Sequence, residues 1–99
     1  MHVIIWEFGV REERVLEFVS ACSSDGDWAK LFGRADGYLE TELLRSSQAS
    51  NVFVTIDRWE NASCFENFQE QFGSEYKKLD AAFEGYTWSE KKLGVFSEP

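Results

Sequence analysis

Hydrophobic and polar positions alternate at the beginning of the chain, which predicts a strand over residues 2–10. Both alternating sets of side chains in this segment are largely apolar, as expected of a strand that is covered on its two faces. Over residues 11–22 the pattern changes: apolar side chains recur at helical spacing, and Glu12, Glu13 and Glu17 lie on the opposite side. We therefore expect a central first strand followed by an amphipathic helix that packs on the sheet.

The next periodic segments are shorter. Trp28, Leu31 and Phe32 recur at helical spacing and predict a short helix that ends near Gly33. A turn with Gly37, which suits a positive φ, leads into alternating residues 38–45, a polar loop over 46–51 and alternating residues 52–60. Two strands joined by so short a loop are expected to be antiparallel neighbours.

The stretch from Val54 to Phe65 connects a strand to the longest predicted helix. Because side chains alternate along a strand, Thr55, Asp57 and Trp59 share one face, and the other face carries Val54, Ile56 and Arg58. Asn61 can cap the first turn of the helix. An apolar stripe then runs at helical spacing over residues 62–83, and a kink or break is expected at Gly73-Ser74. Apolar residues after Gly85 allow a last strand of uncertain register.

The order β-α-(short α)-β-β-α-β is that of the split βαβ, or ferredoxin-like, α+β domain. Its antiparallel sheet carries the helices on one face, so the other face is bare. Val3, Ile5, Val54 and Ile56 would form an apolar patch on that bare face, which is too large to remain in water on a small domain. We therefore predict a single domain over residues 1–96, a homodimer formed through the sheet face, and an unstructured tail over residues 97–99.

Composition narrows the classes of function. The net charge is −8, with 18 acidic and 10 basic residues, which opposes binding to nucleic acid or to an anionic membrane. A signal peptide and long apolar runs are missing from the sequence, so we expect a cytoplasmic protein. Cys22 and Cys64 lack metal-ligand spacing, and His2 is the only histidine. Two reduced thiols are therefore expected, and a metal site is not.

Three segments carry a resemblance to a known family: Gly26-Asp-Trp-Ala-Lys-Leu-Phe32, Gly37-Tyr-Leu-Glu-Thr-Glu-Leu-Leu44 and Thr55-Ile-Asp-Arg-Trp-Glu60. In this order they resemble the antibiotic biosynthesis monooxygenase-type (ABM) domain of the dimeric α/β-barrel superfamily, over nearly the whole chain. The resemblance implies a dimeric α/β barrel with one pocket per subunit, between the sheet and the helices. Some members oxidise polycyclic phenols with O₂ and no cofactor, relatives degrade haem or act on quinols, and many have no known reaction.

The resemblance also points to site residues. Trp59 matches the tryptophan that lines the family pocket, and Thr55 and Asp57 share its strand face. The phenol-oxidising members carry an asparagine where this chain has Thr55 and a tyrosine where it has Phe65, so two polar contacts of the family are absent. Haem-degrading relatives use a histidine of the long helix as the iron ligand. This chain has no histidine after His2, so haem binding in that manner is not expected.

A phenol that reacts with O₂ directly requires an apolar cavity, an orienting donor and a proton acceptor. Asp57 and Trp59 are the candidate catalytic residues, because a carboxyl group buried beside Trp59 would have a raised pKa and could take a phenolic proton. The structural alternatives are an ion pair for Asp57 and a core or rim position for Trp59. The candidate substrate-binding residues are Trp6, Trp28, Phe32, Thr55, Phe65, Phe68 and Tyr76, of which Trp28 and Phe32 could form a lid and Tyr76 could orient a ligand hydroxyl, each with ordinary packing as its alternative.

The first hypothesis is a cofactor-independent monooxygenase that acts on an aromatic phenol or a quinol-like small molecule. The second is a non-catalytic homodimer of the same fold that binds a small ligand or has a purely structural role. A third is an interaction module that uses its acidic surface to bind a basic partner.

Overall fold

A computed structural model describes residues 1–99. The predicted order of strands and helices is confirmed, with a 3-10 turn at each end of the helical layer. The elements are β1 (His2–Val10), a 3-10 turn (Glu12–Arg14), α1 (Val15–Cys22), α2 (Asp27–Phe32), β2 (Tyr38–Arg45), β3 (Val52–Trp59), α3 (Ala62–Phe83), a second 3-10 turn (Glu84–Tyr86) and β4 (Thr87–Phe96). The helix expected over residues 11–22 therefore begins as a 3-10 turn and becomes α-helical only at Val15.

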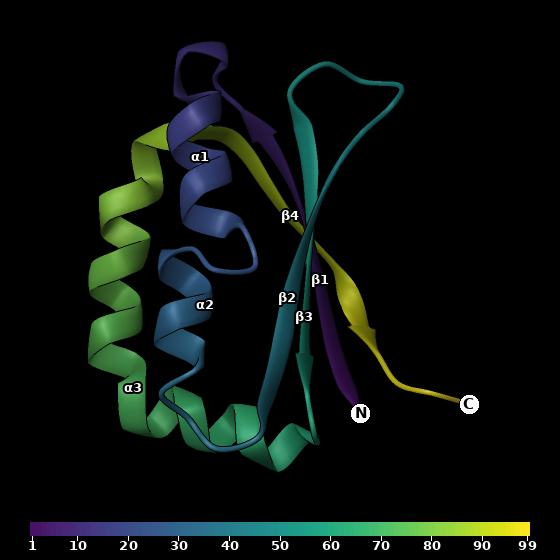
Figure 1. Cartoon of the computed structure of the whole chain (residues 1–99), viewed down its shortest axis with the longest axis vertical. Coiled ribbons are helices and arrows are strands. Elements are labelled where there is room, and N and C mark those ends of the chain that lie inside the picture. Colours follow the sequence, from purple (N-terminus) through teal and green to yellow (C-terminus); the bar gives the residue numbers. More distant parts are fainter.

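The four strands form one antiparallel sheet in the order β2-β3-β1-β4, so β1 and β3 are central. All helices lie on one side of this sheet, and Figure 1 shows the two layers edge-on. This is the ferredoxin-like α+β fold that the sequence predicted. The register of β1 and β3 pairs Ile5 with Ile56 in the middle of the sheet. The pairing of β4 with β1 contains two irregularities in register, and Gly94, at one of them, has φ +154°. These irregularities are why the register of β4 could not be predicted.

The helix-facing side of the sheet carries two separate core clusters. One surrounds Trp59, which is 0 % exposed, and includes Phe32 and Phe68. The other surrounds Phe18 and Phe53 under α1. The partly buried Trp28 ring packs against both clusters. The space between the two clusters is therefore bridged by aromatic side chains instead of being filled by one continuous core.

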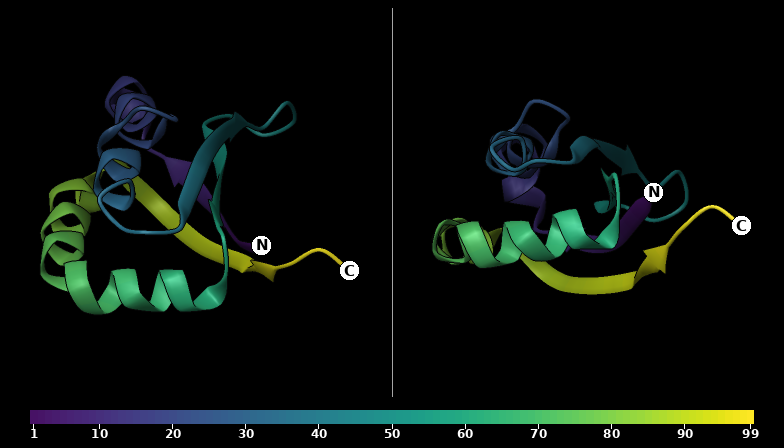
Figure 2. Two further views of the ribbon diagram at one scale, coloured as in Figure 1. Left: turned by 60° about the horizontal axis from the view of Figure 1, so that its bottom comes forward. Right: turned by 90° about the horizontal axis from the view of Figure 1, so that it is seen from below.

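Helix α3 begins at a cap and bends in the middle. The Asn61 side chain accepts a hydrogen bond from the Cys64 backbone N–H at 3.0 Å, as predicted for an N-cap. Phe72, directly before Gly73, has φ −116° and ψ 17°, so the helix is kinked at the predicted place. Figure 2 shows the two halves of α3 pointing in different directions: the first half leaves the end of β3 and crosses the lower end of the molecule in Figure 1, and the second half turns to run alongside α2. Tyr76 and Asp80 come from this second half.

The turn before β2 requires a glycine. Gly37 has φ +87°, and a Cβ at this position would collide with the side chain of Cys64. Both the positive φ and the close approach exclude larger residues. No helix of the protein combines the length and apolar character needed to cross a membrane.

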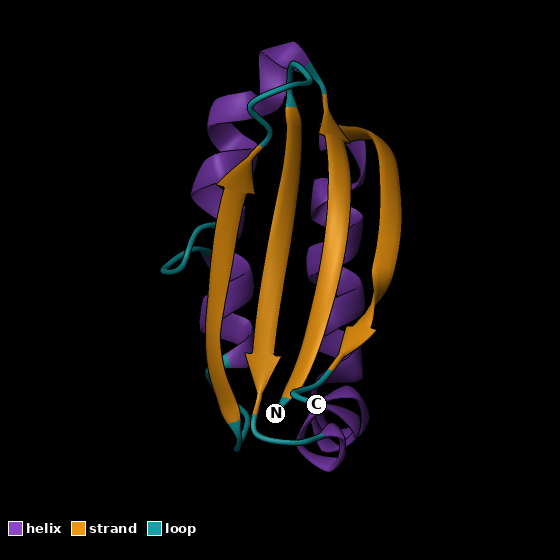
Figure 3. Ribbon diagram, turned by 90° about the vertical axis from the view of Figure 1, so that its right-hand side faces the viewer, coloured by secondary structure: helices purple, strands orange, loops and turns teal.

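The opposite face of the sheet is bare, and Figure 3 looks directly onto it. Strand alternation places Val54, Ile56 and Arg58 on this face, because Phe53, Thr55 and Trp59 are buried on the helix side. Arg58 forms ion pairs with Glu42 and, at 3.3 Å, with Glu40 of β2. The two faces of β3 are thus divided as the alternation predicted. Exposed apolar side chains at the β4 edge add to the surface, among them Trp88, at 62 % exposed, and Phe96 at 50 %.

Candidate functional site

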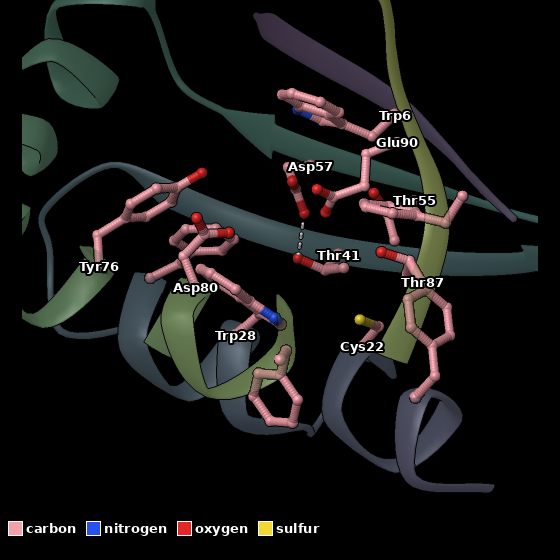
Figure 4. Close-up of a pocket in the computed structure, with 14 residues that line it drawn as sticks. Trp6, Cys22, Trp28, Thr41, Thr55, Asp57, Tyr76, Asp80, Thr87 and Glu90 are labelled. Carbon is pink, nitrogen blue, oxygen red and sulfur yellow. Dashed lines mark hydrogen bonds between the residues drawn. The ribbon is translucent and has the colours of Figure 1, made fainter. Parts of the chain in front are cut away.

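A cavity of about 220 Å³ lies between the sheet and the helices, where the two core clusters leave space. Its 14 lining residues come from all four strands and from α1, α2 and α3. This volume is below the range of about 300–1,000 Å³ that is usual for ligand pockets. The cavity therefore suits a ligand of one or two rings. Figure 4 shows the side chains that face it.

Asp57 provides a largely buried carboxyl group to the cavity. Strand β3 directs its carboxyl group toward the helices, where burial raises its pKa from the ordinary 3.8 to about 6, and a hydrogen bond from Thr41 partly opposes this rise. The Thr41 hydroxyl donates to Asp57 Oδ1 at 2.7 Å (Figure 4). A carboxyl group with a pKa of about 6 is largely ionised at neutral pH and can still accept a proton readily.

A second hydroxyl group continues this chain of hydrogen bonds. The Oη of Tyr38 lies 2.7 Å from the Oγ1 of Thr41. Because Thr41 has one hydroxyl hydrogen and gives it to Asp57, Tyr38 must donate to Thr41. Burial is the main cause that raises the pKa of Tyr38, so its hydroxyl remains a donor at neutral pH. The ionised form of Asp57 is therefore held in place by two hydroxyl groups in sequence.

Aromatic rings supply half of the side chains that line the cavity. Trp28 from α2 meets Tyr76 from α3 edge-on, with ring centroids 5.2 Å apart, and it packs against Phe32 at 6.0 Å. Trp6 from β1 lies over the opposite side and stacks on Phe8 at 6.2 Å. These rings present apolar faces that can hold a flat ligand. Burial, followed by the charges of neighbouring carboxylates, raises the pKa of Tyr76, so its hydroxyl is a hydrogen-bond donor to a ligand.

Two exposed carboxylates stand at the edge of the cavity. Asp80 comes from α3 and Glu90 from β4, and both side chains line the space. Figure 4 shows the Glu90 carboxylate reaching toward Asp57, with Asp80 across the opening. Partial burial, and then the charges of Asp80 and Glu84, raise the pKa of Glu90. No lysine, arginine or histidine lines the cavity.

The structure brings six of the nine predicted site residues to this cavity, namely Trp6, Trp28, Phe32, Thr55, Asp57 and Tyr76. Trp59, Phe65 and Phe68 do not line it. They pack against one another in the adjacent core cluster, where Trp59 meets Phe65 edge-on with ring centroids 5.5 Å apart and lies tilted against Phe68 at 5.3 Å. The Nε1 of Trp59 is buried without a hydrogen-bond partner. Trp59 therefore lies behind the wall of the cavity.

Other cavity residues were not predicted. Thr41 could have been found from the hairpin, since registry pairs it with Asp57. Glu90 depends on the irregular register of β4, which the sequence does not reveal. Asp80 was not predicted, although it lies one helical turn after Tyr76 and therefore shares that side of α3.

Cys22 also faces the cavity but is not a nucleophile. Burial raises the pKa of its thiol to about 12, and the thiolate is the reactive form. Nowhere in the protein, the cavity included, do three His, Cys, Asp or Glu side chains gather in a way that could hold a metal ion. The chemistry that these side chains themselves offer is proton transfer at Asp57 beside aromatic rings.

Comparison with known proteins gives one family and a set of similar folds. The family model described as antibiotic biosynthesis monooxygenase matches residues 1–79. No curated protein matches the chain in sequence.

Solved structures resemble the protein over nearly its whole length. A variant of SnoaB, a cofactor-independent oxygenase from Streptomyces nogalater, is 22 % identical with a TM-score of 0.75, and the match covers 98 % of this chain and 91 % of that one. A Deinococcus radiodurans protein named after the same family has a TM-score of 0.78 at 12 % identity, with 100 % and 93 % covered. PA3566 from Pseudomonas aeruginosa has a TM-score of 0.70 at 13 % identity, with 99 % and 93 % covered. At such identities the likeness shows a shared fold.

Proposed function

Since the chain belongs to the antibiotic biosynthesis monooxygenase family, we propose that it is a cofactor-independent monooxygenase that oxidises a small phenol or quinol in the cavity beside Asp57. The observation that carries this proposal is a largely buried carboxyl group with a pKa of about 6 in a cavity that is lined by aromatic rings. SnoaB, described as a cofactor-independent oxygenase, has the same fold, which supports the reaction class but not a particular substrate.

Asp57 acts as the general base in this proposal. Its carboxylate takes the phenolic proton, and the resulting phenolate is electron-rich enough to reduce O₂. The ring carbon opposite the oxygen, which carries a hydrogen atom, forms a bond to one oxygen atom of O₂. The C–H bond then loses its proton as the O–O bond breaks, and the departing oxygen takes up this proton and the one held by Asp57 to leave as water. Phenol and O₂ are converted to a quinone and water, so the substrate itself supplies the electrons. The aromatic wall keeps bulk water away from the reacting ring.

The other cavity residues position the substrate. Trp6 and Trp28 hold the two faces of the ring, and the Tyr76 hydroxyl donates a hydrogen bond to a substrate oxygen. Thr41 keeps the Asp57 carboxylate oriented and partly opposes the rise of its pKa. Trp59, Phe65 and Phe68 support the wall from the core. Trp59 was a candidate catalytic residue from the sequence, and we assign it this supporting role because it is 0 % exposed.

Oxygen uptake tests the proposal. Chelator-treated protein should consume O₂ in the presence of a small dihydroxyaromatic compound, and one quinone should form for each O₂ consumed. Asp57→Asn should reduce the rate by about 100-fold, within the range for loss of a general base. Asp36→Asn is the matched control, because it removes the same charge from the exposed turn before β2. Equal rates in Asp57→Asn and wild type would show that Asp57 is not the base.

The second candidate function is that of a non-catalytic dimer that binds a small ligand. Binding and oxygen-uptake measurements on the same samples distinguish it from the monooxygenase. Saturable binding of the dihydroxyaromatic compounds, together with oxygen traces identical to those without protein, would favour that function over catalysis.

We further propose that two copies of the chain pair through the bare sheet face. Ile5 and Ile56 lie opposite each other at its centre, and Val3 and Val54 extend the apolar surface next to them. Trp88 and Phe96, both exposed, continue it toward the β4 edge. A β-branched surface of this kind is usually covered in solution. The cytoplasmic location expected from the sequence stays a prediction.

The dimer is tested by measuring molar mass with light scattering during size-exclusion chromatography. Wild type should elute with twice the mass of one chain, and Ile56→Arg should shift the protein to the monomer. Leu16→Arg is the control, because Leu16 is 86 % exposed on α1, on the other side of the molecule. A dimeric Ile56→Arg variant would mean that this face is not the interface.

A further inference from the structure

The charges around the cavity all have one sign. Asp57 lies inside, and Asp80 and Glu90 stand at the exposed edge, on different elements. None of the 14 lining residues is basic. Lys92, which pairs with Trp6 in the register of β4 and β1, is exposed and does not line the cavity. A recess with carboxylates of one sign and apolar walls concentrates a negative potential at its opening.

The walls add a second, independent preference for positive charge. Trp28 and Tyr76 stand beside Asp80, as Figure 4 shows, and Trp6 lies on the other side of the opening. The faces of such rings carry partial negative charge and attract ammonium groups. Aromatic rings and carboxylates around one space are the combination that recognises organic cations.

The same charges oppose a purely anionic ligand. A phenolate formed by proton transfer to Asp57 would face the carboxylates of Asp80 and Glu90, and both would disfavour its negative charge. A positive group on the same ligand, placed between Asp80 and Glu90, would offset this repulsion. The oxidation of a phenol in this cavity is thus easier to understand if the substrate also carries a cation.

We propose that the cavity selects a cationic aromatic ligand, a phenol or quinol of one or two rings that carries an ammonium group, with the ring beside Asp57 and the ammonium group between Asp80 and Glu90. This inference rests on the proposed function and names the substrate class for the same site. The small volume of the cavity sets the number of rings, and the two carboxylates at its edge set the charge.

Binding in the absence of O₂ tests this preference independently of catalysis. Three catechols that differ mainly in charge are compared by titration calorimetry under nitrogen: dopamine is cationic, ethylcatechol is neutral and dihydroxyphenylacetate is anionic. Dopamine should bind about tenfold more tightly than ethylcatechol, from cation–π and ion-pair contributions, and the anion should bind more weakly than both. Equal affinities for the three compounds, or no binding of dopamine, would overturn the inference.

Charge-removing variants locate the effect. Asp80→Asn and Glu90→Gln should each weaken dopamine binding about threefold and leave ethylcatechol binding unchanged. Glu66→Gln is the matched control, because it removes the same charge from an exposed position in the first half of α3. If Glu66→Gln weakens dopamine binding as much as Asp80→Asn does, the preference comes from the net charge of −8, and the assigned subsite is wrong. If oxygen uptake with ethylcatechol equals that with dopamine, the proposed monooxygenase function stands, but the proposed preference for a cationic substrate is wrong.

Discussion

Replacing Asp57 with asparagine should stabilise the protein, and the gain should grow with pH. In the folded protein, burial raises the pKa of Asp57 to about 6, compared with an ordinary value of 3.8. The folded state therefore binds this proton more tightly than the unfolded state. The stabilising contribution is complete below about pH 3.8 and is lost as the pH rises through about 6. The asparagine side chain of the variant cannot be ionised, so the variant shows no such loss.

The size of the effect follows from the two pKa values. Their difference corresponds to about 3 kcal/mol, and about 2 kcal/mol of this should develop between pH 4.5 and pH 8. The Oδ1 of the asparagine can still accept the hydrogen bond from Thr41, so only a small offset that does not depend on pH is expected. The free energy of unfolding of Asp57→Asn, minus that of wild type, should rise by this amount across the range.

Urea titrations at a series of pH values, followed by tryptophan fluorescence, give this difference directly. Asp36→Asn is again the control, because in a chain with net charge −8 the removal of any carboxylate relieves some repulsion. The rise should be clearly larger for Asp57→Asn than for the control. A difference that stays constant from pH 4.5 to pH 8, or that falls, would refute the view that Asp57 is an ionised group held in a poorly solvated place.

Three further predictions concern neighbouring parts of the structure. The rate of oxygen uptake should fall below about pH 6 as Asp57 is protonated. Thr41→Val should move this fall upward by about one pH unit, because the variant lacks a hydrogen bond to the ionised form of Asp57. Thr55→Val makes the same substitution at a residue that does not bond to Asp57, so it should not move the fall. Gly37→Ala should lower the free energy of unfolding by about 2 kcal/mol or more in urea titrations, whereas Gly85→Ala, where a Cβ meets no atom within 4 Å, should have little effect. Trp59→Phe should lower the free energy of unfolding by about 1–3 kcal/mol but change catechol affinity less than about twofold, and a loss of affinity without a loss of stability would place Trp59 in the binding site.

Strand alternation and helical spacing were sufficient to predict most of the fold. Both depend on local geometry, which repeats along the chain regardless of distant contacts. The division of β3 into a helix-facing side with Asp57 and a bare side with Ile56 followed from alternation alone, and the kink of α3 followed from Gly73. The 3-10 turn before α1 was not predicted, because a single 3-10 turn and a single α-helical turn show the same spacing of apolar residues in the sequence.

The cavity was harder to predict, because which residues line it depends on the register of β4 and on the direction of α3. Glu90 faces the cavity only because β4 pairs with β1 through two irregularities, and no local pattern marks them. Asp80 shares its side of α3 with Tyr76, but whether that side reaches the cavity depends on the direction of the helix after the kink at Phe72. Trp59 shows the opposite difficulty: its strand face was predicted, but whether a ring on that face reaches the cavity or the core depends on how Phe32 and Phe68 fill the space next to it.

The kink in α3 also divides the helix into parts with different tolerance to mutation. The fully buried residues of α3, Phe68 and Phe72, both lie in the first half. The second half supplies Tyr76, Asp80 and Phe83 to the cavity, and none of these is fully buried. A change in ligand choice can therefore arise by substitution in a segment that leaves Phe68 and Phe72 untouched, although Tyr76, Leu79 and Phe83 of this segment also pack against the two core clusters. A library restricted to residues 75–83 would vary specificity while leaving the hydrophobic interior of the first half intact, so this segment is a natural starting point for directed evolution.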